Sequence, residues 1–173
     1  MLSDGGAVAG GQLDAPGMLA LLATELEELP TGQGTRLAAS VEQARDQGIH
    51  ADVSVLISDC LVPAADLTDA LRRLSGGGST ATLVHVMDPA EAAPELNGSV
   101  ELRDAETGQS LAATLTDALE DRYSTRYQEF VERTQMLCRA AHVSYVPAST
   151  SADPLELLLA QAGRGVLLAH GAG

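Results

Sequence analysis

The sequence contains no lysine and no tryptophan, and aromatic residues make up only 2% of its 173 residues. All ten basic residues are therefore arginines, against 24 acidic residues, and the formal net charge is −14. Proteins that bind nucleic acid or an anionic membrane surface need a basic face. We therefore expect neither nucleic acid nor a membrane as a partner. The missing lysine also excludes a Walker-type P-loop, although Gly76–Gly78 is rich in glycine.

Cysteine and long apolar runs are also scarce. Cys60 and Cys138 are too few and too far apart for the disulfide framework of a small secreted domain. No apolar run approaches the roughly 18 residues of a membrane-spanning helix, and the start of the chain lacks the basic region of a signal peptide. These features predict a cytoplasmic protein. The length predicts a single domain over residues 1–173, with a weakly structured start at 1–14 that holds a small strand or hairpin.

The segment Val53–Ser58 is the centre of the predicted fold. It is an apolar run without polar alternation, which predicts a strand buried on both faces, as in a parallel sheet. A second such run covers 80–87, and a shorter one covers 143–146. We expect 53–58 and 81–87 to be adjacent and parallel, with helices on both faces. This predicts a three-layer, doubly wound α/β fold of Rossmann-like type with a mostly parallel sheet.

Apolar spacing and capping residues predict the helices between these strands. They cover residues 14–29, 36–47, 64–74 and 116–141, and a last helix begins at Asp153-Pro154. Thr35 is placed to cap the second of these helices. The glycines at 76–78 predict a flexible break. Alternating residues from Val100 and a return arm with Leu111 predict a β-hairpin.

Polar residues follow the predicted strands where parallel sheets place ligands, beyond the carboxyl ends. A hydroxyl and a carboxylate, from Thr35 and Ser58-Asp59, could together hold a hard cation such as magnesium. Asp88, after the next strand, would neighbour Asp59. The alternative stays open: Thr35 caps a helix, Asp59 ends a turn, and Asp88 before Pro89 starts one.

A nucleophilic role for Cys60, with His85 or His142 as its base, is less favoured by the sequence. Cysteine catalysis needs an electropositive setting that lowers the thiol pKa. Asp59 stands next to Cys60 and would raise that pKa instead. Most free cysteines are small buried apolar residues, and we expect the same here.

Taken in order, several segments resemble the carboxyl-terminal part of the family called domain of unknown function 58. The resemblance covers about residues 12–168. It rests on the segments 34–37, 55–59, 84–91, Pro94, 104–108, the long helix with Arg122 and Tyr127, and 153–155. The family has a von Willebrand factor A-like fold and is often encoded beside MoxR-type AAA+ ATPases. The resemblance implies a metal ion-dependent adhesion site in which Thr35 and Asp59 are ligands.

The sequence departs from that family at the start of the domain. The adhesion site also requires Asp-x-Ser-x-Ser on the first strand, and no such motif is present. The nearest string, Asp66–Ala70, falls on a predicted helix. The chain thus resembles the family from the third strand on, which predicts an amino-terminally truncated domain: a fragment, a gene with a misplaced start or a degenerate relative.

Two functions follow as hypotheses. The first is a non-enzymatic protein-interaction module that acts with a MoxR-type AAA+ ATPase in the assembly or maturation of other proteins. Its reduced site, Thr35 and Asp59 with Ser58 and Asp88 as neighbours, would bind Mg²⁺ weakly or not at all. The second is a metal-dependent hydrolase that uses Asp59 and Asp88. Without the first strand, one edge of Val53–Ser58 is unpaired, which predicts self-association or poor stability of the isolated chain.

Overall fold

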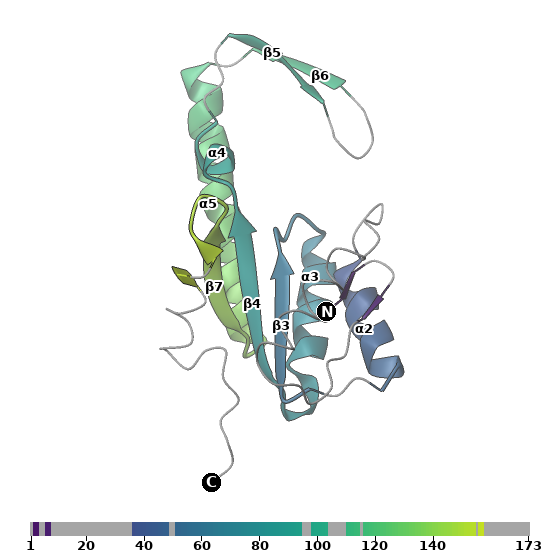
Figure 1. Cartoon of the computed structure of the whole chain (residues 1–173). Coiled ribbons are helices and arrows are strands. Elements are labelled where there is room, and N and C mark those ends of the chain that lie inside the picture. Colours follow the sequence, from purple (N-terminus) through teal and green to yellow (C-terminus); the bar gives the residue numbers. More distant parts are fainter. Residues whose placement is uncertain are drawn as a thin grey trace. The chain divides into compact units, whose positions relative to one another are not determined.

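The computed structural model describes residues 2–3, 6–7, 36–48, 51–94, 98–103, 110–114, 116–154 and 156–157 (Figure 1). The chain divides into two compact units, one of Met1–Ala51 with Val62–Leu74 and one of Asp52–Leu61 with Ser75–Gly173. The predicted helix 14–29 and the predicted cap Thr35 lie outside the described residues. That the whole chain forms a single domain stays a prediction.

The described residues of the first unit form a short hairpin and two helices. The strands β1 (Leu2–Ser3) and β2 (Gly6–Ala7) pair antiparallel, as the sequence predicted for this start, and both contact the helix α2 (Leu37–Asp46). Helix α2 in turn packs with α3 (Ala64–Leu74). Both helices were predicted within a residue or two. One apolar face of each helix is buried, with Leu37, Val41 and Ala44 on α2 and Leu67, Ala70, Leu71 and Leu74 on α3.

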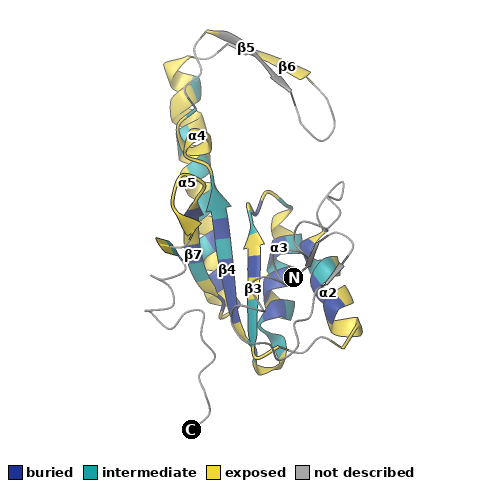
Figure 2. Cartoon of the chain, viewed as in Figure 1, coloured by how far each residue is buried: buried dark blue, intermediate teal, exposed yellow. Residues whose placement is uncertain are grey.

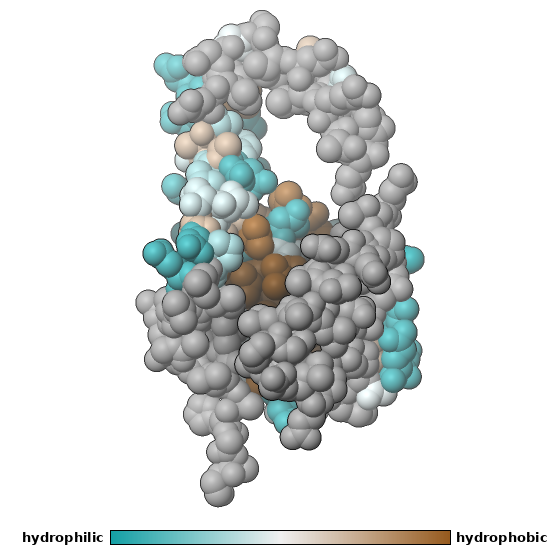
Figure 3. Space-filling model, viewed as in Figure 1, coloured by the Kyte–Doolittle hydropathy of each residue, from teal (hydrophilic) through white to brown (hydrophobic). Residues whose placement is uncertain are grey.

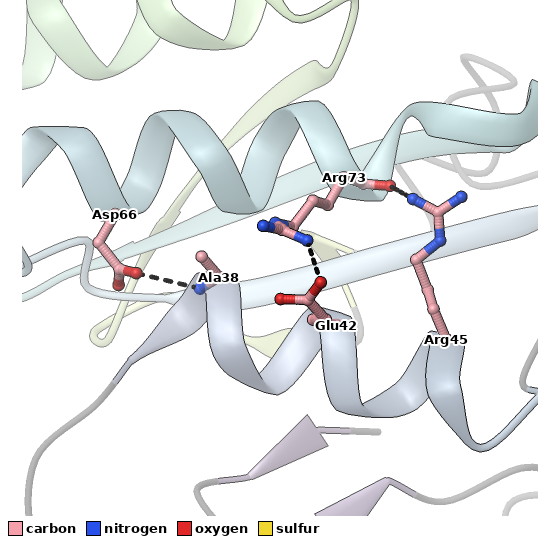
Figure 4. A network of polar contacts seen from close by, with 5 residues as sticks. All are labelled: Ala38, Glu42, Arg45, Asp66 and Arg73. Atoms are coloured by element: carbon pink, nitrogen blue, oxygen red, sulfur yellow. Dashed lines mark hydrogen bonds and ion pairs between the residues drawn. The ribbon is translucent and has the colours of Figure 1, made fainter.

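Helix α2 begins with a cap from a distant part of the chain. Arg36, at the N-cap position, makes no side-chain cap. The carboxylate of Asp66 on α3 instead accepts the N–H groups of Leu37 and Ala38 at 2.8 and 3.2 Å. Figure 4 shows the bond to Ala38. A carboxylate is favoured here because these N–H groups lack intrahelical partners and carry the positive end of the helix dipole. Two further contacts of Arg73 join the same helices, an ion pair with Glu42 at 2.8 Å and a carbonyl that accepts from Arg45 at 3.2 Å.

The second unit is organised around a parallel sheet. The strands β3 (Val53–Ser58), β4 (Thr80–Met87) and β7 (Ser144–Ser149) lie in the order β3-β4-β7. Leu56 stands opposite Leu83, and Val84 opposite Val146, in two parallel ladders. The connection from β3 to β4 contains α3, and the connection from β4 to β7 contains α5 (Asp117–Ala140). The fold is therefore α/β and Rossmann-like, as predicted, and the pairing of β3 with β4 is confirmed.

The prediction that β3 is buried on both faces is wrong (Figure 2). Strand β4 is buried at Ala81, Thr82, Leu83 and His85, and the last two are fully inaccessible. On β3 only Leu56 is buried, whereas Val55 and Ile57 are 45% and 66% exposed. Alternate side chains of a strand point to opposite faces, so Leu56 and the Val55–Ile57 pair lie on different sides of the sheet. Among the described strands β3 pairs only with β4, which leaves its other edge without a strand.

The remaining described elements of this unit are two helices, a hairpin and a 3-10 turn. Strands β5 (Ser99–Arg103) and β6 (Ser110–Thr114) form the predicted antiparallel hairpin. Helix α5 begins after its N-cap Thr116 and contacts β7, and the residues that it buries are Thr134 and Cys138. The helix is thus covered only toward its carboxyl end, and Tyr123 is 42% exposed. The glycines predicted as a flexible break form the 3-10 turn Gly76–Gly78, in which Gly77 takes a positive φ of 83°.

Candidate functional site

Three strand ends bring the predicted site residues to one edge of the sheet. Strands β3, β4 and β7 are parallel, so their carboxyl ends lie at the same edge of the sheet. That edge carries Ser58-Asp59, Asp88 and Ser149-Thr150. Asp59, which the sequence suggested as a metal ligand, and its suggested neighbours Ser58 and Asp88 therefore lie at this edge. The other suggested ligand, Thr35, lies outside the described part of the chain.

The loop after β3 holds Asp59 in a turn. The Ser58 hydroxyl accepts the N–H of Cys60 at 3.0 Å, and Asp59 Oδ1 accepts the N–H of Leu61 at 3.1 Å. Between them Cys60 has a φ of 60°, in the left-handed region that non-glycine residues seldom adopt. One carboxylate oxygen of Asp59 is therefore engaged by its own loop. The residue is nevertheless exposed at the surface, next to Leu61, which is 67% exposed.

Asp88 has a structural role at the end of β4. Its carboxylate accepts the N–H of Ala90 at 2.8 Å, and Glu91 accepts the N–H of Asp88 in return, which makes a capping box for α4 (Pro89–Ala92). The other carboxylate oxygen accepts from the Thr150 hydroxyl at 2.8 Å. The bond from Ala90, and after it the bond from Thr150, lowers the pKa of Asp88. The turn-starting role left open by the sequence is confirmed, and it uses both carboxylate oxygens.

A buried histidine joins all three strands below this edge. His85 Nε2 lies 3.1 Å from the carbonyl oxygen of Asp59, and Nδ1 lies 2.8 Å from the Tyr145 hydroxyl. A carbonyl oxygen can only accept, so Nε2 carries the proton, and in the neutral ring Nδ1 accepts from the tyrosine. Burial lowers the pKa of His85, which keeps the ring neutral. The imidazole thus fixes the Asp59 backbone to β4 and, through Tyr145, to β7.

The sequence pointed to His85 for a different reason. The sequence suggests His85 as a base for Cys60, and it gives no sign that Tyr145 is the partner of this histidine. The only signal was a histidine in the middle of an otherwise apolar strand, which often marks a buried, hydrogen-bonded polar group. The ring also meets Phe130 of α5 edge-on, with centroids 5.5 Å apart, so this face of the sheet is the one that α5 covers.

The two cysteines are buried thiols. Cys60 is 1% exposed and Cys138 is fully inaccessible, and neither forms a disulfide. Burial raises the pKa of Cys60 to about 12, with smaller contributions from Cys138 and Asp59, and burial raises that of Cys138 to about 11. Both are therefore protonated at neutral pH. The nucleophilic role that the sequence disfavoured gains no support from this environment.

The donors at the sheet edge do not form a magnesium site by themselves. In the part of the chain that the structure describes, no three Asp, Glu, His or Cys side chains gather closely enough to hold a metal ion. Asp88 already uses both carboxylate oxygens, and Asp59 uses one. Magnesium prefers a near-octahedral shell of oxygen ligands, so a single free carboxylate oxygen makes a weak site.

Comparison with known proteins places the chain in a family. Residues 9–134 of the 173 match the family model described as "Protein of unknown function DUF58". The chain belongs to this family. The resemblance inferred from the sequence is thereby confirmed at the level of DUF58, over a match that ends at residue 134 rather than near 168. No match was found for this DUF58 protein among curated proteins or among solved structures. None of its described helices is long and apolar enough to cross a membrane.

Proposed function

We propose that this DUF58 protein is a non-enzymatic interaction module of von Willebrand factor A type. Its partner in this proposal is a MoxR-type AAA+ ATPase, and its role is the assembly or maturation of other proteins. The partner class comes from the family resemblance. The observation that carries the proposal is the open side of β3, where Ile57 and Leu61 are 66% and 67% exposed on either side of Asp59.

The chemistry of this surface suits recognition of a protein. Large apolar side chains that stay exposed around a single charged group are typical of binding surfaces. The edge of β3 that faces away from β4 also presents backbone N–H and C=O groups, which another chain can pair with. Asp59 sits at the end of that edge, held by the Leu61 N–H and, through its carbonyl, by His85.

The hydrolase alternative has less support. It needs Asp59 and Asp88 to share a cation with further ligands. Both Asp88 oxygens already accept hydrogen bonds within the fold, and among the described residues no three acidic, histidine or cysteine side chains gather closely enough to hold a metal ion. No observation at this edge favours hydrolysis over binding.

Binding measurements with apolar-to-charged substitutions test the proposal. We expect the full chain to bind a purified MoxR-type ATPase in sedimentation velocity, and Ile57→Asp and Leu61→Asp to weaken binding about tenfold or more. Met136→Asp is the matched control, since Met136 is 58% exposed on α5. Equal losses for all three variants, or no binding by the unmodified chain, would contradict the proposal.

Without a partner, we expect the same edge to drive self-association. The sedimentation coefficient should rise with concentration, and hydrogen exchange along Val53–Ile57 should slow as it does. Ile57→Asp should keep the chain monomeric, because a charge on an edge strand opposes pairing with another chain. A stable monomer at all concentrations, with strong protection along both edges of β3, would show that the edge is covered.

A further inference from the structure

A groove lies on the face of the sheet that points away from α5. It has a volume of about 450 Å³, and its floor is Val55 and Ile57 of β3, Val84 and Val86 of β4, and Val146 and Ala148 of β7. His85 faces α5, so its neighbours Val84 and Val86 point to the opposite side. Figure 3 shows hydrophobic side chains gathered in the region where Figure 1 draws the ends of β3 and β4.

Exposure changes steadily across this groove. Val146 and Ala148 on β7 are 2% and 7% exposed, Val84 and Val86 on β4 are partly exposed, and Val55 and Ile57 on β3 are mostly open. The β7 side of the groove is therefore already covered, and the β3 side is not. A segment that covers the rest of the groove would therefore extend from its β7 side.

The chain itself enters the groove at that side. After β7, Pro154 and Leu157 line the groove, and the N–H of Leu157 donates to the carbonyl of Asp153 at 3.2 Å, as in a first helical turn. The residues that follow, Leu158–Ala169, lie outside the described part of the chain. They contain four leucines and a valine, and Arg164 is their only charged residue.

The reach of this segment fits the groove. The sequence predicts a helix from Pro154 to about Gly163, and ten helical residues span about 15 Å. The distance from β7 to β3 is two strand spacings, or about 10 Å. A helix that is apolar nearly all round, as this one would be, is normally buried rather than exposed.

We propose that the chain's own segment 158–168 docks in this groove and covers β7 and β4. The segment leaves the β3 side of the groove, with Ile57, and the neighbouring Leu61 open to a partner. The groove would then be part of the core of the second unit, and its aliphatic floor would hold the leucines that follow Leu157.

A double-mutant cycle tests this contact. Leu158→Ala should lower the folded-to-unfolded ratio about thirtyfold or more if Leu158 is buried, and by less than about threefold if it is exposed. Combined with Val84→Ala on the groove floor, its effect should be non-additive. Combined with Leu83→Val, on the same strand but the other face, it should be additive, because side chains that do not touch act independently.

Cysteine pairs in the full chain give a second, independent measurement. Leu158→Cys should form an intramolecular disulfide with Val84→Cys or Val86→Cys under mild oxidation, and none with Met136→Cys on α5. Additive cycles together with no groove disulfide would overturn the proposal. So would disulfide-linked dimers, which indicate a second copy in the groove, or coupling of Val84→Ala to Leu22→Ala, which indicates the predicted helix 14–29.

Discussion

Strands β3 and β4 are neighbours with similar sequences and different surroundings. Both are runs of valine, leucine and threonine or serine, and they pair in parallel along six positions from Val53–Thr80 to Ser58–His85. On β4, Leu83 and His85 are fully inaccessible. On β3, Ile57 is 66% exposed. An apolar run thus predicts a strand, but it does not say how many neighbours the strand has.

The polar groups of β3 and β4 differ in the same way as their apolar residues. At the end of β4, Asp88 caps α4 and accepts from Thr150, and His85 holds both Tyr145 and the Asp59 carbonyl. At the end of β3, the Asp59 side chain accepts only from its own loop, at Leu61, in the hydrogen bonds identified. Strand β4 is therefore the structural centre of the second unit, and the outer side of β3 is the place where the unit can meet something else.

Truncating one apolar residue on each strand is the most direct way to break this comparison. Leu83→Ala should lower the free energy of unfolding by about 2–5 kcal/mol, because it leaves a cavity in a fully buried site. Ile57→Ala, at an exposed site, should change it by about 0.5 kcal/mol or less. Urea denaturation of the two variants measures both values. Similar losses would mean that the outer face of β3 is buried in solution.

Removal of the Tyr145 hydroxyl tests how much the hydrogen bond between His85 of β4 and Tyr145 of β7 contributes to stability. Tyr145→Phe removes the hydroxyl that donates to His85 Nδ1. We expect the free energy of unfolding to fall by about 1–3 kcal/mol, which is typical of an unsatisfied buried polar group. Tyr123→Phe is the control, since its hydroxyl donates to Glu91 at an exposed site. A loss at Tyr145 no larger than at Tyr123 would show that the His85 bond adds little.

A hydrogen-bonded carboxylate and an exposed one can also be compared in the first unit. Asp66→Asn should lower the free energy of unfolding by about 1 kcal/mol, because its carboxylate accepts two N–H groups at the start of α2. Asp69→Asn is the matched control, on the same helix but exposed. If both variants unfold at the same urea concentration, the Asp66 cap contributes nothing measurable.

Acid should destabilise the fold through His85. Its pKa in the folded state lies below the ordinary value of 6.5, since burial disfavours the imidazolium. The contribution of neutral His85 to the free energy of unfolding is therefore complete above pH 6.5, and it is lost as the pH falls below 6.5 toward the folded pKa. Between pH 7 and 6 the free energy of unfolding should fall by about 0.7 kcal/mol or less through this residue. His85→Gln should remove this part of the pH dependence, and His142→Gln, at an exposed turn, should keep it. An NMR titration that gives His85 a pKa of 6.5 or higher would contradict the assignment.

Local patterns in the sequence were enough to predict most of the described elements. The spacing of Leu37, Val41 and Ala44 predicted the buried face of α2, and Thr116 correctly marked the start of α5. The third strand was predicted only to Val146, but β7 continues to Ser149. Pro147 cannot donate to a ladder, so it reads as the end of a strand, although β7 lies at the edge of the described sheet and tolerates it.

Contacts between distant residues could not be predicted in the same way. Asp66 caps a helix 29 positions earlier, and His85 meets Tyr145 60 positions later. Neither pair leaves a periodic signal, because each depends on which elements the fold brings together. For the same reason the sequence placed Asp59 and Asp88 at one sheet edge correctly but could not show that Asp88 is already occupied.

The smallest effect we expect is that of magnesium on this edge. The described residues provide one free carboxylate oxygen on Asp59, and a shell of six oxygens cannot be completed from it except by water. Calorimetric titration of the full chain should therefore show weak binding or none, and Asp59→Ala should change the heat signal little. Glu91→Ala, at a second exposed carboxylate near the same edge, is the control for non-specific binding. Submicromolar affinity that disappears in Asp59→Ala alone would show that further ligands, such as Thr35, complete the site.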